Sequence, residues 1–408
     1  MPCVTNTSKP TNEEIMVGRF RGYFTPAIAS FGIIGNILVI LTFTQMQRRH
    51  YSRFNIYVLC IAYSQTVDLI INALLDDFLG RGLHWISDCT IRIKLDTWSS
   101  FSCKFFSYVP KTTSFLSNGL LVVFTIDRLL TAINPIKFRG DQFLYPAKWC
   151  MFIMLLLSLT LFIPQLIHYD LVFKGNNDFL ISETLCNFVD SLKWPVQFVL
   201  WIAIVGTHTL PAMFITGCNV FILIKLRGIS QRRYRLGVTK QHSIGEMRRI
   251  MGHLSLTTIF LFLTIPLVVV IILRQQSDRQ NYLLYHPAYA KQVEDLSRLF
   301  SSFEAVSYST QFPIFLAFLP NFRQTLVRIW CNNRLLRDTS CAQSCLRSTN
   351  AEGSVRPTST RRGSFLMTRF MKVMATGTTR NNTNTPRLPC NQRPVYLLEL
   401  PYDYDQGL

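Results

Sequence analysis

The chain has 408 residues, of which 49% are hydrophobic and 16% are charged, and its mean hydropathy is +0.22. Soluble domains of this length seldom combine positive hydropathy with so few charges, so these values argue against a cytosolic enzyme. The net charge of +19 fits either nucleic acid or an anionic membrane as partner. With 13% aromatic residues, lipid-facing surface is the better fit, and we expect no nucleic-acid partner.

Seven apolar stretches are long enough to cross about 30 Å of hydrocarbon as helices, which takes roughly 20 residues each. They are residues 24–43, 54–78, 101–130, 148–167, 194–226, 248–273 and 296–319. Prolines inside several of them are tolerated in a membrane bundle, because neighbouring spans satisfy the freed backbone groups. We therefore predict an all-α membrane protein, a seven-transmembrane helix bundle over residues 23–319.

The basic residues predict the orientation in the plasma membrane. With residues 1–22 outside the cell, most of the basic excess falls in cytoplasmic loops and in the tail, as the positive-inside rule requires. The odd number of spans then leaves the C-terminus in the cytoplasm. Residues 1–22 lack the apolar core of a cleavable signal peptide. Asn6 there begins an acceptor pattern for N-glycosylation.

Four of the eleven cysteines lie outside or at the outer rim in this topology, where oxidising conditions permit disulfides. They are Cys3, Cys89, Cys103 and Cys186. We favour a bond between Cys103 and Cys186, which would hold the loop between spans four and five to the outer end of span three. Cys3 with Cys89 is a second candidate, and the sequence does not separate the three connectivities that four cysteines allow.

Charged residues at the cytoplasmic face form the main candidate site. Asp127 and Arg128 stand near the inner end of the third stretch. Glu246 lies about 30 Å along a helix from Pro266 of the sixth stretch, again at the inner face. A cation and two carboxylates are therefore expected to converge where the bundle meets the cytoplasm.

In these motifs and their spacing the chain resembles the rhodopsin-like G-protein-coupled receptors, over about residues 24–330. The residues that carry the resemblance are Gly35-Asn36, Ile61-Ala62, Cys103, Asp127-Arg128, Trp149, Pro211, Phe260 with Pro266, and residues 313–319 running into Pro320-Asn321-Phe322-Arg323.

The resemblance implies that Arg128 is held at rest by Asp127 and, across the bundle, by Glu246. Both pairs are partly buried, so breaking either leaves a poorly solvated charge. An agonist would favour an outward swing of the sixth span about Pro266, which releases Arg128 to a heterotrimeric G protein. The agonist shifts this equilibrium by its differential affinity for the two states.

Several positions depart from the family pattern. The sodium-binding aspartate of the second span corresponds to Gln65, while Asp68 lies one turn further out on the same face. Thr264 stands where the family has a tryptophan near the sixth-span proline. The Asn-Pro-x-x-Tyr motif is replaced around Pro313 and Phe315, where the tyrosine hydroxyl is lost.

The residues at the positions where such receptors bind their ligands argue against two classes of ligand. Pro110 occupies the place of the aspartate that binds biogenic amines in such receptors, so an aminergic receptor is not expected. The seventh stretch has no lysine to carry retinal, and we expect no cofactor, no metal ion and no enzymatic activity. The outer rim mixes both charges, and its candidate ligand-pocket residues are Asp76, Lys111, Arg274 and Glu304.

Mixed charge of this kind suits a peptide ligand, and residues 312–315 look like those of invertebrate FMRFamide-type neuropeptide receptors. A chemosensory receptor for small molecules would share the whole scaffold and is one alternative. A membrane transporter is an alternative of another class, but the halves of the chain show none of the internal similarity common in transporters.

Residues 320–331 alternate apolar and basic side chains at helical spacing. This pattern predicts an amphipathic interfacial helix on the lipid bilayer, with Cys331 as a candidate palmitoylation site. Residues 332–408 are rich in Ser, Thr, Asn and Arg, and we expect a disordered cytoplasmic tail. Ser364 follows a basic motif that suits a basophilic kinase, and phosphate there would give arrestin a charge to bind. A receptor kinase is a further expected partner.

Overall fold

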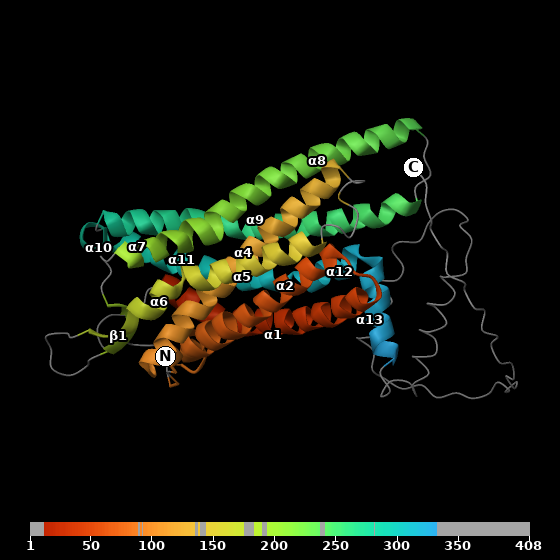
Figure 1. Ribbon diagram of the computed structural model, residues 1–408. Coiled ribbons are helices and arrows are strands. Elements are labelled where there is room, and N and C mark those ends of the chain that lie inside the picture. The colour runs from red at the N-terminus through yellow and green to blue at the C-terminus, as the bar shows by residue number, and fades with distance from the viewer. Residues whose placement is uncertain are drawn as a thin grey trace, which may run out of the picture. The chain divides into compact units, whose positions relative to one another are not determined.

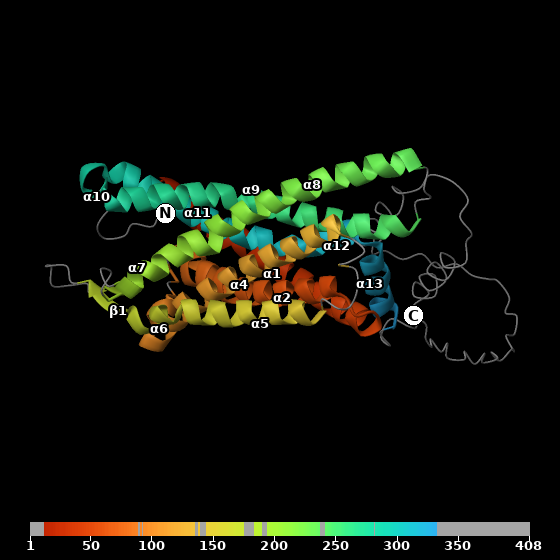
Figure 2. The same ribbon diagram turned by 45° about the horizontal axis from the view of Figure 1, so that its top comes forward.

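The computed structural model describes residues 12–88, 90–91, 93–134, 138, 144–174, 183–189, 194–236, 241–280 and 282–332. All of them belong to the first of two units of the chain, residues 1–350 and 351–408. Long helices run side by side, with a two-stranded β-hairpin at one end of the bundle and helix α13 at the other (Figure 1 and Figure 2). We call these the hairpin end and the α13 end.

The first two helical stretches form an antiparallel pair. Helix α1 spans Asn12–Arg49, and Glu14 in its first turn suits the positive end of the helix dipole. The helix therefore begins inside the segment 1–22 that the sequence assigned to the exterior. The second stretch is α2 (Arg53–Asp68), continued by the π-helical η1 (Leu69–Gly82) and the short α3 (Leu83–Ile86).

The third and fourth stretches differ in continuity. After the 3-10 turn η2 (Leu95–Thr97), helix α4 runs unbroken through Ser100–Ile133, and the Ser99 hydroxyl caps it by accepting from the Ser102 amide at 3.0 Å. The predicted fourth span is divided into α5 (Leu144–Leu161) and α6 (Ile163–His168). Pro164 explains the break, because a proline lacks the amide donor and clashes with the preceding turn.

The connection after α6 is a β-hairpin, which the all-helical prediction did not include. Strands β1 (Tyr169–Lys174) and β2 (Glu183–Phe188) pair antiparallel, with Leu171 opposite Cys186. Cys186 is bonded to Cys103 of α4, with Cα atoms 5.5 Å apart. The predicted disulfide is confirmed, and it fixes the hairpin to the end of α4.

The remaining helices complete the bundle. They are α7 (Trp194–Trp201), the π-helical η4 (Ile202–Thr209), α8 (Leu210–Leu236), α9 (Gln241–Arg279), α10 (Tyr282–Tyr285), α11 (Pro287–Ser309), α12 (Gln311–Phe318) and α13 (Pro320–Asn332). Helix α13 begins at the predicted residue and ends one residue later than predicted.

Six helical stretches within the described ranges are long and apolar enough to cross a membrane. They are Glu14–Arg49, Arg53–Ile86, Ser100–Ile133, Leu144–His168, Trp194–Gly228 and Met247–Ser277. The seventh predicted span, residues 296–319, is formed by the second half of α11 and by α12. Charged residues lower the hydropathy of α11, but the helix packs against α1 and α9 and so closes the seven-helix bundle.

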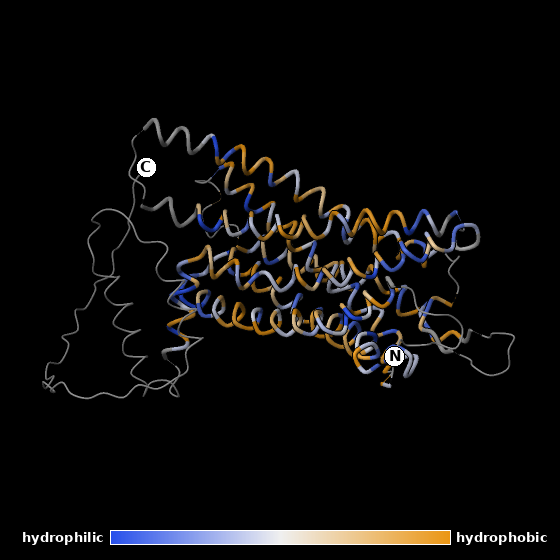
Figure 3. Tube along the Cα trace, turned by 180° about the vertical axis from the view of Figure 1, so that it is seen from behind, coloured by the Kyte–Doolittle hydropathy of each residue, from blue (hydrophilic) through white to orange (hydrophobic). Residues whose placement is uncertain are grey.

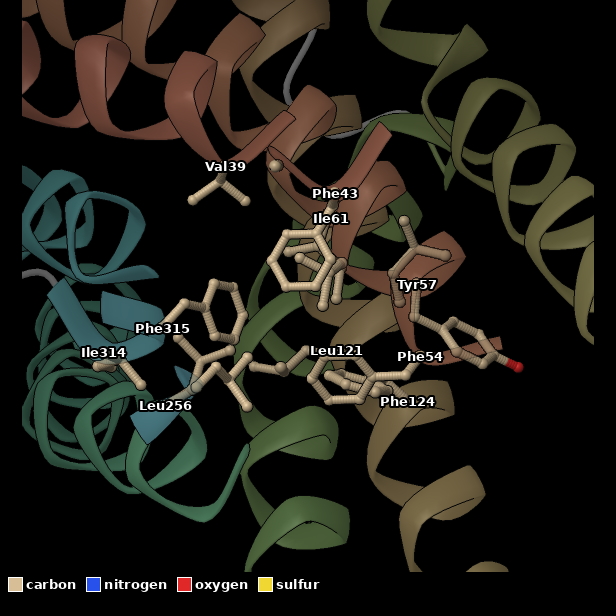
Figure 4. Packing of buried hydrophobic residues seen from close by; sticks show 14 of the residues in the cluster. Val39, Phe43, Phe54, Tyr57, Ile61, Leu121, Phe124, Leu256, Ile314 and Phe315 are labelled. Atoms are coloured by element: carbon tan, nitrogen blue, oxygen red, sulfur yellow. The ribbon is translucent and has the colours of Figure 1, made fainter. Parts of the chain in front are cut away.

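The lipid-facing surface and the core are both rich in apolar side chains. Apolar residues cover the long middle sections of the helices (Figure 3), and α5 exposes Trp149, Phe152 and Ile153. Towards the α13 end the interior is aromatic (Figure 4), where the rings of Phe43 and Phe315 lie 5.2 Å apart. This aromatic core packs directly beneath the charged residues described next.

Candidate functional site

Asp127 and Arg128 form a buried ion pair near the α13 end of α4. Their side chains are 8% and 10% exposed, and an Arg128 guanidinium nitrogen donates to Asp127 Oδ2. The other carboxylate oxygen, Oδ1, accepts from Arg53 Nη1 at 2.6 Å. Arg53 is the first residue of α2 and also donates to the Phe138 carbonyl. Asp127 is therefore shared between two arginines from different helices.

Aromatic rings enclose the Arg128 guanidinium. Its central carbon lies 5.4 Å from the Phe54 ring centroid and 5.5 Å from that of Phe124. Stacking on ring faces stabilises a cation that water does not reach. Arg128 Nε is buried without a hydrogen-bond partner in the part of the chain that the structure describes. The guanidinium thus has unused donor capacity.

Helix α9 lies beside this pair. His253 is fully buried, its ring centroid is 4.6 Å from that of Phe124, and its Nε2 lies 3.3 Å from Thr125 Oγ1. His253 has no feature in its local sequence that would mark it as part of this site. Glu246, the predicted cross-bundle partner of Arg128, belongs to the same helix, but its side chain lies outside the described part. The pair between Glu246 and Arg128 stays a prediction.

The predicted hinge residues occupy different helical settings. Pro266 lies inside α9, which continues through it without a break. Pro313 is the third residue of α12, and the chain is interrupted before it at Thr310. A proline is tolerated in the first turn of a helix, where amides have no partner in the helix, so Pro313 accounts for the interruption.

A polar cluster occupies the middle of the bundle. Thr113 Oγ1 of α4 donates to Asp68 Oδ1 at 2.7 Å, and Ser114 Oγ donates to Glu304 Oε1 of α11 at 2.6 Å. The Tyr308 hydroxyl donates to the same Glu304 oxygen. Asp68 is 2% exposed. Of the predicted pocket residues, Glu304 is the one that the structure places in this cluster.

Salt bridges at the hairpin end engage two other predicted pocket residues. Asp76 of η1 lies 2.9 Å from Arg81, and Arg274 of α9 lies 3.6 Å from Glu294 of α11. Lys111 is exposed on α4 and makes no ion pair with a described residue. The four predicted residues therefore do not form one cluster.

A second network at this end was missed by sequence reasoning. Arg21 of α1 lies 3.4 Å from Asp77 of η1 and donates to Ser302 Oγ of α11 at 3.1 Å. Ser302 in turn donates to Asp77 at 3.1 Å. Arg21 was missed because it lay in the segment assigned to the exterior.

A hollow of about 410 Å³ lies next to the end of α9 that carries Arg274. It is lined by Leu273, Gln276, Tyr282, His286 and Tyr289.

The sequence pattern of the 7 transmembrane receptor (rhodopsin family) matches residues 35–311. The chain belongs to this family. The match confirms the resemblance inferred from Asp127-Arg128 and the other motifs, and with it the seven-span, multi-pass membrane fold. The matched range includes every named residue of the polar cluster around Asp68 and Glu304, and it includes Asp127 and Arg128.

Named receptors are similar to this rhodopsin-family chain at low identity. Somatostatin receptor type 2 of Mus musculus is 24% identical over 257 residues, which cover 60% of this chain and 61% of that receptor. Somatostatin receptor type 1 of Rattus norvegicus is 23% identical over 305 residues, 74% of this chain and 68% of that receptor. The mesotocin receptor of Rhinella marina is 20% identical over 254 residues, 60% and 59% of the two chains. The chain thus spans about three fifths of the mouse receptor's length.

Other predicted sites in this rhodopsin-family chain lie outside what the structure describes. Asn6, Ser364, Cys3 and Cys89 are outside the described residues, and Cys331 is described for its backbone alone. The family departures are placed more clearly. Gln65 and Thr264 are both buried at 6% exposure, and Phe315 is buried at 1%. Phe315 packs by ring contacts in the aromatic core, consistent with the loss of the tyrosine hydroxyl at this position.

Proposed function

We propose that this rhodopsin-family chain is a plasma-membrane receptor that binds an extracellular peptide and activates a heterotrimeric G protein. The observation that carries the proposal is the buried Asp127–Arg128 pair, with Asp127 shared by Arg53, at one end of a seven-helix bundle. Because the Asp127 carboxylate is shared with Arg53, a G protein that binds the buried Arg128 guanidinium can take its place.

The orientation is part of the proposal. We place the hairpin end outside the cell, because the disulfide between Cys103 and Cys186 suits an oxidising compartment. The α13 end then faces the cytoplasm, where Arg48 and Arg49 at the end of α1 and Arg323 of α13 meet anionic lipid. Residues 332–408 form the cytoplasmic tail in this arrangement.

The mechanism follows from the contacts of Arg128. In the resting arrangement Asp127 and two aromatic rings hold its guanidinium inside the bundle. Agonist binding at the hairpin end favours a state in which α9 swings outward about Pro266. Arg128 then loses its enclosure and donates to a G-protein helix. The agonist stabilises this state by the difference between its free energies of binding to the two states.

Both the named relatives and the residues of this chain favour a peptide ligand. The relatives named above are receptors for somatostatin and mesotocin by their names, and a melanin-concentrating hormone receptor is similar over a shorter range. In this chain, Pro110 leaves an amine without the aspartate expected for it, and the hairpin end carries both charges. These points favour a peptide over the small molecules of a chemosensory receptor.

Modifications and further partners complete the proposal. Asn6 would carry an N-glycan outside the cell, and Cys331 would carry a palmitoyl group at the end of α13. Phosphorylation of Ser364 by a basophilic kinase would add negative charge to a basic tail, which arrestin would bind.

A screen of synthetic peptides on cells that express the full chain with a promiscuous G protein tests the function. Calcium release should occur with at least one peptide and should be absent in cells that express Arg128→Ala at the same surface level. Signals from small polar molecules, with none from any peptide, would overturn the peptide assignment. A peptide signal that persists with Arg128→Ala would overturn the coupling mechanism.

A further inference from the structure

Two carboxylates from opposite sides of the bundle meet one turn of α4. Thr113 and Ser114 are consecutive residues, and their hydroxyls donate to Asp68 of α2 at 2.7 Å and to Glu304 of α11 at 2.6 Å. Asp68 and Glu304 also interact with each other electrostatically. The helices have thus brought two acidic groups together at mid-depth, where the cost of an uncompensated charge is high.

Among the described residues, only neutral groups donate hydrogen bonds to these two carboxylates. Asp68 accepts further from the Asn72 amide at 3.4 Å, and Glu304 accepts from the Tyr308 hydroxyl. Among the residues that the structure describes, no Lys, Arg or His forms an ion pair with either carboxylate. Asp77 and Asp127 are different, since each of them is paired with arginines. Among the described residues, the pair formed by Asp68 and Glu304 therefore has no cation at ion-pair distance, although Lys111 interacts with Asp68 electrostatically.

One further buried polar atom near the pair has no partner. Gln65 lies one turn from Asp68 on α2, and its Oε1 is buried without a donor among the described residues. Buried polar atoms are nearly always hydrogen-bonded, so the unused capacity of Gln65 Oε1 indicates an absent donor. His208 of η4, which is 8% exposed, interacts electrostatically with Glu304 and with Lys111.

The backbone around the pair departs from regular α-helix. Asp68 is the last residue of α2, immediately before the π-helical η1, and His208 lies near the end of the π-helical η4. Single π-helical turns inside helices are frequent at functional sites. Glu304 is half-buried, and Lys111, one turn from Ser114, is exposed.

We propose that Asp68 and Glu304 form a subsite for a cationic group of the ligand, a guanidinium or a primary ammonium. A guanidinium has five donors in a planar fork, enough in number for both carboxylates and for Gln65 Oε1. The cation removes the repulsion between the carboxylates and supplies the absent donor. This inference rests on the proposed function, because it names the chemistry of one part of the peptide.

The first test needs no knowledge of the peptide. The thermal midpoint of the full-length chain in detergent is measured with Nα-acetylargininamide and with Nα-acetylcitrullinamide, its uncharged isostere, in potassium chloride and in sodium chloride; these two are called argininamide and citrullinamide below. Argininamide should raise the midpoint by about 1–2 °C when present near its Kd, and citrullinamide should not. Glu304→Gln and Asp68→Asn should remove the difference. Glu294→Gln, the same change on the same helix at a carboxylate already paired with Arg298, should keep it.

The second test uses pools of amidated peptides that carry either arginine or citrulline at one fixed position. Pools with arginine should activate the wild type about tenfold more potently than the matched citrulline pools. Glu304→Gln should lower the ratio of potencies between arginine and citrulline pools to about one. An equal loss for both kinds of pool would show a structural role for Glu304 and would overturn the subsite.

The two tests separate the subsite from the proposed function. Stabilisation by argininamide without activation by any peptide pool would support the subsite and contradict the peptide-receptor function. Activation by peptides, with arginine and citrulline equivalent and no stabilisation by argininamide, would overturn the subsite and leave the function standing. If sodium alone stabilises the chain through Glu304 and argininamide adds nothing, the pair holds a small inorganic cation and the inference is wrong.

Discussion

Arg53 Nη1 lies 2.6 Å from Asp127 Oδ1, so the first residue of α2 is bound to the acidic residue next to Arg128. Both side chains are mostly buried, at 12% and 8% exposure. Arg53 also reaches the Phe138 carbonyl, in the connection that follows α4. The contact therefore ties together three segments that meet at the α13 end.

Replacing Arg53 by Gln should lower the stability of the chain. Removing Arg53 takes one of two arginines from the mostly buried Asp127 carboxylate and leaves Arg128 as its partner, so a charged hydrogen bond is lost at a cost of about 2 kcal/mol. This corresponds to a fall in the thermal midpoint of roughly 4 °C or more. The measurement is thermal unfolding of the full-length chain in detergent. Arg49→Gln, at an exposed arginine on α1, is the matched control, and an equal fall in both variants would contradict a specific role for Arg53.

Replacing Glu246 by Ala should raise basal G-protein activation. If Glu246 holds Arg128 across the bundle at rest, its loss destabilises the resting state and shifts the population toward the active one, by about tenfold for each 1.4 kcal/mol. Basal activity is measured with an energy-transfer sensor of G-protein dissociation at matched surface expression. An unchanged basal level would show that Glu246 does not restrain Arg128.

Replacing Cys103 or Cys186 by Ser should be equally damaging, and the double substitution should cost no more than either single one. The bond fixes the β-hairpin to α4, so either change releases the same constraint. Surface expression and thermal midpoint are the measurements. Strongly unequal single variants, or a further loss in the double variant, would mean that one cysteine has a role apart from the bond.

Much of the fold is readable from the sequence, because apolar runs of membrane length have few alternatives to a helix. The expected runs map onto α1 through α12, and the amphipathic pattern of residues 320–331 predicts α13 (Pro320–Asn332) closely. Phe322 shows why that helix stays at the bundle, since its fully buried ring packs 5.5 Å from that of Phe43.

The sequence did not reveal contacts between residues that lie far apart in the chain. Arg53 was counted as one basic loop residue, and nothing in its local sequence indicates that Asp127 is its partner. The meeting of Asp68 and Glu304 on α4 depends on helix rotation and on the π-helical η1, which local propensity does not encode. Pro164 itself was visible in the sequence. Because membrane helices often contain proline without a break, its presence did not predict that the fourth span would be divided.

The most direct test of the account is the basal activity of Asp127→Asn with and without a second change, Arg128→Ala, at matched surface expression. Asp127→Asn removes the carboxylate that holds Arg128, and basal G-protein activation should rise several-fold. Adding Arg128→Ala should return activation to the level of cells without the receptor, because the released guanidinium is what engages the G protein. Raised activity that persists in the double variant would contradict the central role of Arg128.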